Sequence, residues 1–352
     1  MTTRPTHERE QVTNKTSLSL IAEKIRNYSG LIRKQPIEDV FNELVLKGQP
    51  GLAPPNFGDD AAAIPWKDGF LLFAADGIMP RLLINEPYAA GKASVMVTVN
   101  DIYAMGGRPL AMVNVLASGD EDHRRKVVQG IRKGCEKLQV PMVGGHLHPD
   151  ASVQAPALSV AILGWAQNVL HGYTAQTGDD LILAVDLNGK VGCHSVTSWD
   201  ANSGKSPQEL LNRLECLPLI AEKNWAHAAK DVSNAGLIGT VSIMMENSGK
   251  GAEINLESIP TPSEIAFSDW LFSFQSFGFV LSVPPRHTAK VIGLFHERKI
   301  NASVIGKVFE EPKIRIIQGL DVETLFDFTK DKITGIVYRP PVPRSLKTQE
   351  CI

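Results

Sequence analysis

Hydrophobic and polar positions follow two different periods along this chain, and both periods occur in each half. Apolar residues spaced three or four apart predict helices at residues 18–28, 37–46, 87–105, 121–138, 208–229, 237–247 and 287–297. Short apolar runs between turn residues predict strands at residues 70–75, 110–116, 140–143, 152–165, 181–185, 251–256, 277–283 and 302–309. Strands that alternate with helices in this way predict an α+β or α/β fold.

The chain length and one polar interruption predict two domains. At roughly 150 residues per domain, 352 residues correspond to about two domains. The polar stretch 168–179 runs into the turn sequence Thr-Gly-Asp-Asp and marks a boundary. We therefore expect an N-terminal domain over residues 18–168 and a C-terminal domain over residues 169–340. The polar ends are expected to be tails, which are residues 1–17 (disordered) and 341–352.

Composition and charge exclude several classes of protein. The chain has 36 Lys and Arg against 38 Asp and Glu, so its formal net charge of −2 gives no general reason to bind nucleic acid or an anionic membrane. The longest apolar stretch, Ala157–Ala166, is half of the ~20 residues that a membrane helix needs. The four cysteines form no C-x-x-C pair. We expect a cytoplasmic protein with neither a nucleic acid nor a membrane as partner.

Four aspartates lie where an apolar element ends, each beside Gly or a small residue: Asp60, Asp76, Asp101 and Asp231. A single aspartate in such a place is usually a cap or a turn residue. Four of them favour a shared role, because a carboxylate beside an apolar element is costly to desolvate unless it is paired or metal-bound. Mg²⁺ uses a few carboxylates and bridges phosphate oxygens. Neither a P-loop nor a G-x-G-x-x-G is present, so the common phosphate cradles are excluded.

Five segments, in order along residues 50–310, carry a resemblance to known enzymes. Phe57–Ile64 (FGDDAAAI) resembles the G-D-D-A-A segment of thiamine-monophosphate kinases. The other four resemble selenophosphate synthetase motifs, and they are Asn100–Leu110 (NDIYAMGGRPL), Gly144-Gly145-His146, Asp231–Gly239 (DVSNAGLIG) and Ser248–Ile254 (SGKGAEI). The chain is thereby identified as a member of the PurM-like superfamily. This superfamily includes aminoimidazole ribonucleotide (AIR) synthase, selenophosphate synthetase, thiamine-phosphate kinase and the hydrogenase maturation dehydratase, and the chain best fits an AIR-synthase-related branch.

The resemblance implies a PurM-like two-domain fold and an ATP- and Mg²⁺-dependent enzyme. Its N-terminal domain would form a β-barrel on homodimerisation, and its C-terminal domain an α/β sandwich. The enzyme would activate or phosphorylate a small-molecule acceptor by kinase- or synthetase-like phosphoryl transfer. The metal ligands carried over are Asp59, Asp60, Asp76, Asp101 and Asp231, of which Asp101 and Asp231 would be catalytic. The residues expected to bind the nucleotide are Gly58, Asn100, Gly144, Gly145 and His146.

The chain also departs from its relatives. Selenophosphate synthetases carry a reactive Cys or selenocysteine and a Lys in an N-terminal Gly-rich segment. Residues 1–57 contain no Cys here, and Lys34 lies outside such a segment. Thiamine-phosphate kinases have aspartates where this chain has His146 and Asn234. The acceptor therefore stays open, and so does the alternative of a non-catalytic nucleotide-binding regulator or assembly subunit. His146 with His148 could also hold a transition metal, although no third ligand is visible.

Overall fold

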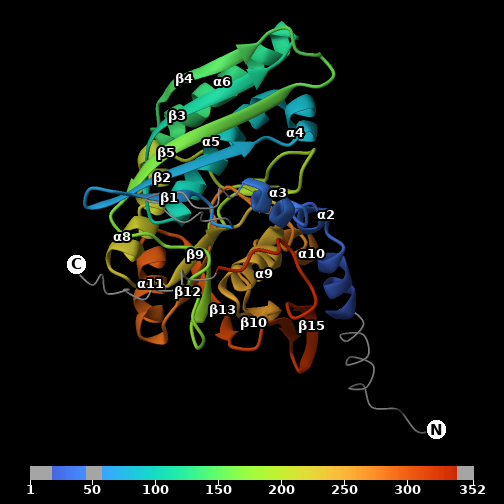
Figure 1. The fold of residues 1–352 in the computed structure, drawn as a ribbon, viewed down its shortest axis with the longest axis vertical. Coiled ribbons are helices and arrows are strands. Elements are labelled where there is room, and N and C mark those ends of the chain that lie inside the picture. Colours follow the sequence, from blue (N-terminus) through green and yellow to red (C-terminus); the bar gives the residue numbers. More distant parts are fainter. Residues whose placement is uncertain (1–17, 45–57, 339–352) are drawn as a thin grey trace, which may run out of the picture.

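The computed structural model describes residues 18–44 and 58–338. Over these residues the chain forms two large β-sheets, stacked one above the other along the long axis of the molecule (Figure 1). The two predicted tails, residues 1–17 and 341–352, lie outside the described residues. The predicted boundary between residues 168 and 169 stays a prediction.

The first sheet belongs to the N-terminal half and has helices on one face only. Its spatial order is β1 (Ala62–Trp66), β2 (Gly69–Gly77), β5 (Ala157–Ala166), β3 (Arg108–Ala117) and β4 (Met142–His148). Neighbouring strands are antiparallel except for the parallel pair β3 and β4. The short helix α4 (Pro80–Asn85) and the long helices α5 (Pro87–Ala104) and α6 (Glu121–Leu138) lie along one side of this sheet (Figure 1).

The other face of this sheet is apolar, and no helix or strand of residues 18–44 and 58–338 covers it (Figure 1), so that we call it the bare face. Strand residues alternate between the two faces. On β3, Met112 and Leu116 are buried towards the helices, whereas Val113 and Val115 are exposed. The exposed set continues across the sheet, and its members include Ile64, Trp66 and Phe73. A contiguous apolar surface of this kind marks an interaction site more often than a solvated face.

The second sheet belongs to the C-terminal half and is mixed. Its order is β15 (Asp321–Asp327), β14 (Lys313–Gln318), β10 (Gly251–Asn255), β13 (Asn301–Phe309), β6 (Asp180–Val185), β12 (Gly278–Val283) and β9 (Ala228–Asp231). The helices of this half are α7 (Pro207–Leu214), α8 (Cys216–Glu222), α9 (Gly236–Ser248), α10 (Phe267–Trp270) and α11 (Pro285–Glu297). A 3₁₀ turn, η1 (Leu256–Ser258), follows β10.

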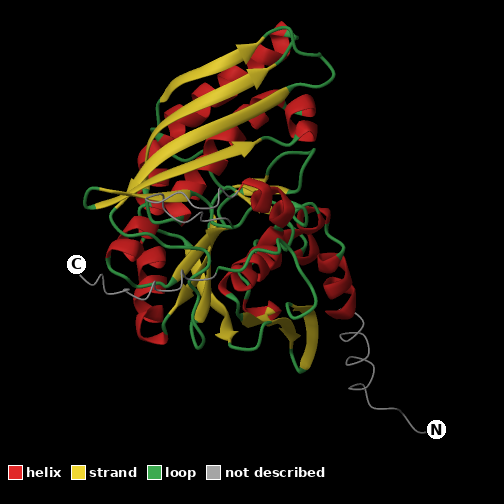
Figure 2. Cartoon of the chain, in the orientation of Figure 1, coloured by secondary structure: helices red, strands yellow, loops and turns green. Residues whose placement is uncertain are grey.

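Strand β6 is buried on both faces, because helices cover both sides of the second sheet (Figure 2). Ile182 packs in the same core as α8 and α11, and Leu183 packs in the core that contains α9. Residues 18–26 are helical and lie against this second core, followed by α2 (Ser29–Ile32) and α3 (Ile37–Leu44). A small third sheet of β7 (Lys190–Val191), β8 (Ser198–Asp200) and β11 (Phe274–Gln275) lies between the two halves.

Two sequence predictions in this half are wrong. The predicted helix 208–229 is two helices, α7 and α8, followed by strand β9, because Asn224 takes a left-handed conformation and ends the helical stretch. Residues 188–207, where the sequence pattern predicts neither a helix nor a strand, contain strands β7 and β8. The α+β class itself is confirmed. Among the described residues, no helix is long and apolar enough to cross a membrane.

Candidate functional site

Three of the predicted aspartates converge beneath the first sheet. Asp60 follows the turn at Gly58, Asp101 lies in the last turn of α5, and Asp231 ends β9. The Nζ of Lys230 forms an ion pair with Oδ1 of Asp60, and the backbone N–H of Asp231 donates to Oδ2 of the same carboxylate at 3.2 Å. These contacts therefore attach the turn that contains Asp60 to the end of β9.

The turn at Gly58 is shaped by its glycine. Its φ of +95° is in the left-handed region, and a Cβ there would lie 2.6 Å from Nδ2 of Asn247. Its carbonyl accepts hydrogen bonds from Nζ of Lys230 at 3.1 Å and from Nδ2 of Asn247 at 2.8 Å. Gly58 thus positions Asp60 through the fold of its own turn.

Asp101 and Asp231 are held close to other carboxylates. Burial and the neighbouring Asp231, Asp60 and Asp76 raise the pKa of Asp101 well above its usual range. Burial and Asp60 raise the pKa of Asp231 to about 8, although Lys230 opposes this shift. Within the described residues neither side chain forms an ion pair with a cation. A group of acids with strongly shifted pKa values is typical of a functional site.

The sequence interpretation missed the cations that accompany these acids. Lys230 precedes Asp231 and is buried with it. Lys34, in the turn between α2 and α3, is half-buried, and its pKa is lowered by burial and by Lys230, while Asp231 and Asp60 act in the opposite direction. Burial raises the pKa of Asp76, and Lys34 and Arg33 are among the groups that oppose this rise. Lys230 could have been noticed as a Lys beside a predicted ligand, but nothing near Lys34 in the sequence points to this site.

Asp59 and Asp76, the other two predicted metal ligands, have different surroundings from the three converging aspartates. Asp59 is buried, and its carboxylate accepts hydrogen bonds from Nδ1 of His171 at 2.7 Å and from the backbone N–H of Gly172 at 2.5 Å. It thereby attaches the Gly58 turn to the segment between the halves. Asp76 lies near the end of β2, accepts from the N–H of Gly77 at 2.9 Å and remains accessible to solvent. Its pKa is raised, chiefly through desolvation.

The predicted nucleotide-binding residues lie in two places. Asn100 is buried near the acids, and its Nδ2 donates to the carbonyl of Ser276 at 3.4 Å. Gly144, Gly145 and His146 lie on the edge strand β4 and are exposed. Gly145 pairs with Asn114, which pairs with Val160, which pairs with Asp76. Three strand spacings of about 4.8 Å place Gly145 about 14 Å from Asp76 across the sheet.

A Mg²⁺ ion fits this chemistry as part of a nucleotide complex. Among residues 18–44 and 58–338, no group of three or more His, Cys, Asp and Glu side chains is placed to hold a metal ion. Nucleotide-bound Mg²⁺ takes only one or two carboxylates and obtains its other ligands from phosphates and water. Asp101 and Asp231, which lack a cationic partner, are suited to that smaller role.

A cavity of about 310 Å³ opens beside the acids. Asp76, Gly77 and Asn234 are among the residues that line it. Its walls come from α4, α5 and α6 on one side and from the 190–202 segment on the other. Asp76 therefore connects the group of acids to a space that a small molecule could fill.

The family of the chain follows from comparison with known proteins. Residues 58–166 match the N-terminal domain of AIR synthase related proteins, and residues 176–319 match their C-terminal domain. The chain is 36% identical over 324 residues to an uncharacterized protein of Methanocaldococcus jannaschii, covering 91% of this chain and 99% of that protein. It is 37% identical over 278 residues to an uncharacterized protein of Synechocystis sp., covering 79% and 86% of the two chains. The chain belongs to the AIR synthase related proteins.

More distant relatives have named activities. A selenide, water dikinase of Pelobacter propionicus is 26% identical over 300 residues, covering 74% of this chain and 86% of that one. Thermotoga maritima PurL in complex with ATP has a TM-score of 0.71 at 17% identity, covering 94% of this chain and 56% of that chain. The AaThiL complex with AMPPCP and TMP has a TM-score of 0.61 at 18% identity, covering 82% and 96%. The chain spans about half the length of the PurL chains.

These likenesses confirm the predicted superfamily and a mixed two-domain PurM-like fold. They do not show the predicted β-barrel, which would form only on dimerisation.

Proposed function

We propose that this protein is an ATP- and Mg²⁺-dependent enzyme that activates or phosphorylates a small-molecule acceptor. The observation that carries the proposal is the convergence of Asp60, Asp101 and Asp231 close to Asp76, which lines the cavity. Grouped carboxylates repel one another and cost stability, and a magnesium–triphosphate ligand would compensate for this repulsion. Structures of the same fold that hold ATP, ADP or AMPPCP support a nucleotide as that ligand.

The residues around the acids have distinct roles in this proposal. Asp101 and Asp231 would hold Mg²⁺, which supplies positive charge to the transferred phosphoryl group. Lys230 keeps Asp60 in place beside them. Lys34 directs a positive charge to the same region, where phosphate oxygens would lie. Asp76 faces the cavity and would lie closest to the acceptor.

The remaining predicted residues complete the nucleotide site. Gly58 and Asn100 shape the site beside the acids. Gly144, Gly145 and His146 would meet a nucleotide only if it extended along the sheet from Asp76 to β4. Their pairing in one row across the sheet supports this arrangement.

A homodimer is part of the same proposal. The bare face of the first sheet carries exposed apolar residues from β1 to β3, including Trp66, Phe73 and Val113. A second copy of this face would cover them and close the two sheets into a barrel. A cytoplasmic location and the absence of nucleic-acid and membrane partners stay predictions.

Calorimetric titration with ATP, with and without Mg²⁺, tests the proposal. We expect Mg²⁺-dependent binding that Asp101→Asn abolishes and that Asp68→Asn leaves unchanged, since Asp68 is exposed in the turn between β1 and β2. A panel of acceptors is then screened for Mg²⁺-dependent release of ADP or AMP. Binding without release across the panel would favour the non-catalytic regulator, and an absence of binding would refute both functions.

A further inference from the structure

The cavity beside the acids has walls from both halves of the chain. Helices α4, α5 and α6 form one side, and β7, β8 and Phe274 form the other. Its volume of about 310 Å³ equals that of about ten water molecules in the liquid. This volume lies at the lower end of the range for ligand pockets and suits a small organic molecule.

Much of the lining of the cavity is apolar. The side chains that line it include Ile78, Met79, Leu82, Met96, Val196 and Phe274. An apolar lining contributes little to binding a bare inorganic ion, whose hydration would be lost without compensation. It favours a ligand with a hydrocarbon or aromatic body.

Three lysines also line the cavity, and they are Lys92, Lys137 and Lys190. Within the described part of the chain, none of them lies within ion-pair distance of a carboxylate. Lys92 donates to Oγ of Ser203 at 3.2 Å, and Lys137 donates to the carbonyls of Asn202, at 3.4 Å, and Lys205. Since an ammonium group has three donors, Lys92 and Lys137 keep hydrogen-bonding capacity for a ligand.

Three acids also line the cavity, and two of them, Glu86 and Asp200, already accept hydrogen bonds from residues of the 195–203 segment. Glu86 accepts from the backbone N–H and the hydroxyl of Ser195. Asp200 accepts from the backbone N–H groups of Asn202 and Ser203, both at 2.9 Å, and from the Ser203 hydroxyl. Burial, followed by the nearby Lys133 and Lys92, lowers the pKa of Lys137. The cavity should therefore bind an anionic ligand in preference to a cationic one.

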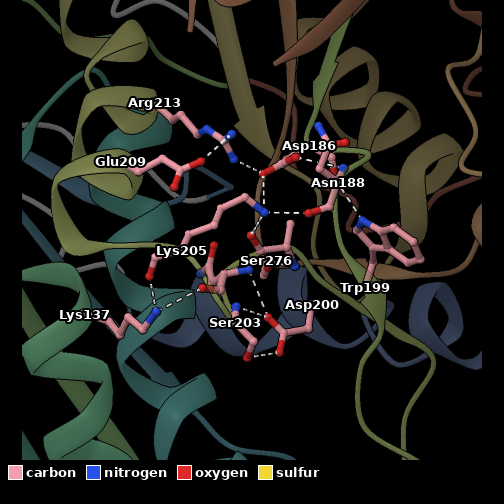
Figure 3. A network of polar contacts seen from close by, with 12 residues as sticks. Lys137, Asp186, Asn188, Trp199, Asp200, Ser203, Lys205, Glu209, Arg213 and Ser276 are labelled. Atoms are coloured by element: carbon pink, nitrogen blue, oxygen red, sulfur yellow. Dashed lines mark hydrogen bonds and ion pairs between the residues drawn. The ribbon is translucent and has the colours of Figure 1, made fainter. Parts of the chain in front are cut away.

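The wall formed by the 186–206 segment is held in place by a polar network (Figure 3). Lys205 forms an ion pair with Asp186 at 3.1 Å and donates to the carbonyls of Asn188 and Ala201. Asp186 also pairs with the buried Arg213. Because Lys137 of α6 donates to the carbonyl of Lys205, the network joins the two walls and keeps the cavity open.

We infer that this cavity binds the acceptor, and that the acceptor is an organic anion with an apolar body. Its phosphate or carboxylate group lies towards Lys92, Lys137 and Lys190, its body lies along α5, and its reactive group faces Asp76. The identity of the bound molecule as the acceptor rests on the proposed function. The chemistry of the cavity rests on its own residues.

Calorimetric titration of the metal- and nucleotide-free protein tests this inference with four probes. They are phenyl phosphate, phenylacetate, benzyl alcohol and inorganic phosphate. We expect one of the two organic anions to bind at least ten-fold more tightly than benzyl alcohol and inorganic phosphate. Whichever anion binds more tightly identifies the preferred anionic group.

Variants locate the binding. Lys92→Met removes a positive charge from the cavity, and Ala93→Phe fills part of its volume. Each variant should weaken binding of that anion at least ten-fold. Lys126→Met, on the exposed side of α6, is the matched control and should bind like the wild type. In the wild type, the bound anion should also slow alkylation of Cys193, which lines the cavity, relative to Cys135, which does not.

Equal binding of benzyl alcohol, unchanged binding in both variants, or unprotected Cys193 would overturn the inference. Failure of the two anions to bind would do so as well. Mg²⁺–ATP binding to the wild type is measured separately. Its absence would refute the proposed function and leave the cavity's chemistry standing, whereas its presence without anion binding would refute this inference alone.

Discussion

Lys230 and Asp60 form an ion pair that joins the two halves of the molecule at the candidate site. Both side chains are almost fully buried, with exposed fractions of 9% and 8%. The pair leaves Asp101 and Asp231 as the acids without a cationic partner. It therefore separates a structural carboxylate, Asp60, from two that are available to a ligand.

Removal of Lys230 should strongly destabilise the protein. Lys230→Met leaves Asp60 buried beside Asp231 without its cation, and loss of one partner of a buried pair costs about 3–5 kcal/mol. Urea denaturation should show this loss in the free energy of unfolding. The double variant Lys230→Met/Asp60→Asn removes both charges and should recover a large part of the loss. If the double variant is as unstable as the single one, the pair is not what stabilises this contact.

Asp101→Asn should have opposite effects on stability and on nucleotide binding. The substitution removes one of the mutually repelling acids, so we expect the metal-free protein to gain about 0.5–2 kcal/mol in the free energy of unfolding. The gain in melting temperature that Mg²⁺–ATP gives the wild type should disappear. Thermal melting with and without Mg²⁺–ATP measures both effects. A variant that is less stable and still responds to Mg²⁺–ATP would show that Asp101 is a structural residue.

The metal-free protein should become less stable as the pH rises from about 4 to about 8. The pKa of Asp231 is about 8 in the folded protein and near 3.8 when unfolded. Between these values the folded state holds a proton that the unfolded state has released. Stability is therefore highest at low pH and is lost as the pH rises through the folded pKa. Asp231→Asn should flatten this part of the profile, which chemical denaturation at several pH values would measure.

The helices and strands were predictable where the apolar residues of a segment follow a single spacing, either that of a helix or that of a strand. Helix α6 begins and ends at the predicted residues, because its apolar face is regular and the Asp120 side chain caps it by accepting from the N–H of His123 at 2.7 Å. Strand β9 (Ala-Ala-Lys-Asp) was missed, because a segment of four residues buried on both faces shows no alternation that distinguishes a strand from a helix.

The candidate site was predictable only in part, for a similar reason. Asp60, Asp101 and Asp231 carry a local signal, since each ends an apolar element beside a small residue. Lys34 reaches the same place only through the path of α2 and α3 across the molecule, which no local pattern encodes. The sequence also could not separate Asp59 from Asp60. Their different partners, His171 and Lys230, lie far along the chain.

The bare face of the first sheet should be an interface between two copies of the chain. Val113 on β3 and Phe73 on β2 are 43% and 51% exposed in the single chain, and they lie on either side of β5 in an apolar surface. A glutamate at Val113 would bring two like charges into the closed barrel, where they would be desolvated without a partner. Val113→Glu should therefore shift the protein from dimer to monomer in analytical ultracentrifugation. Leu320→Glu is the control, because Leu320 is 94% exposed in the turn between β14 and β15, away from this face. A wild-type monomer at micromolar concentration, or an intact Val113→Glu dimer, would show that this face does not pair.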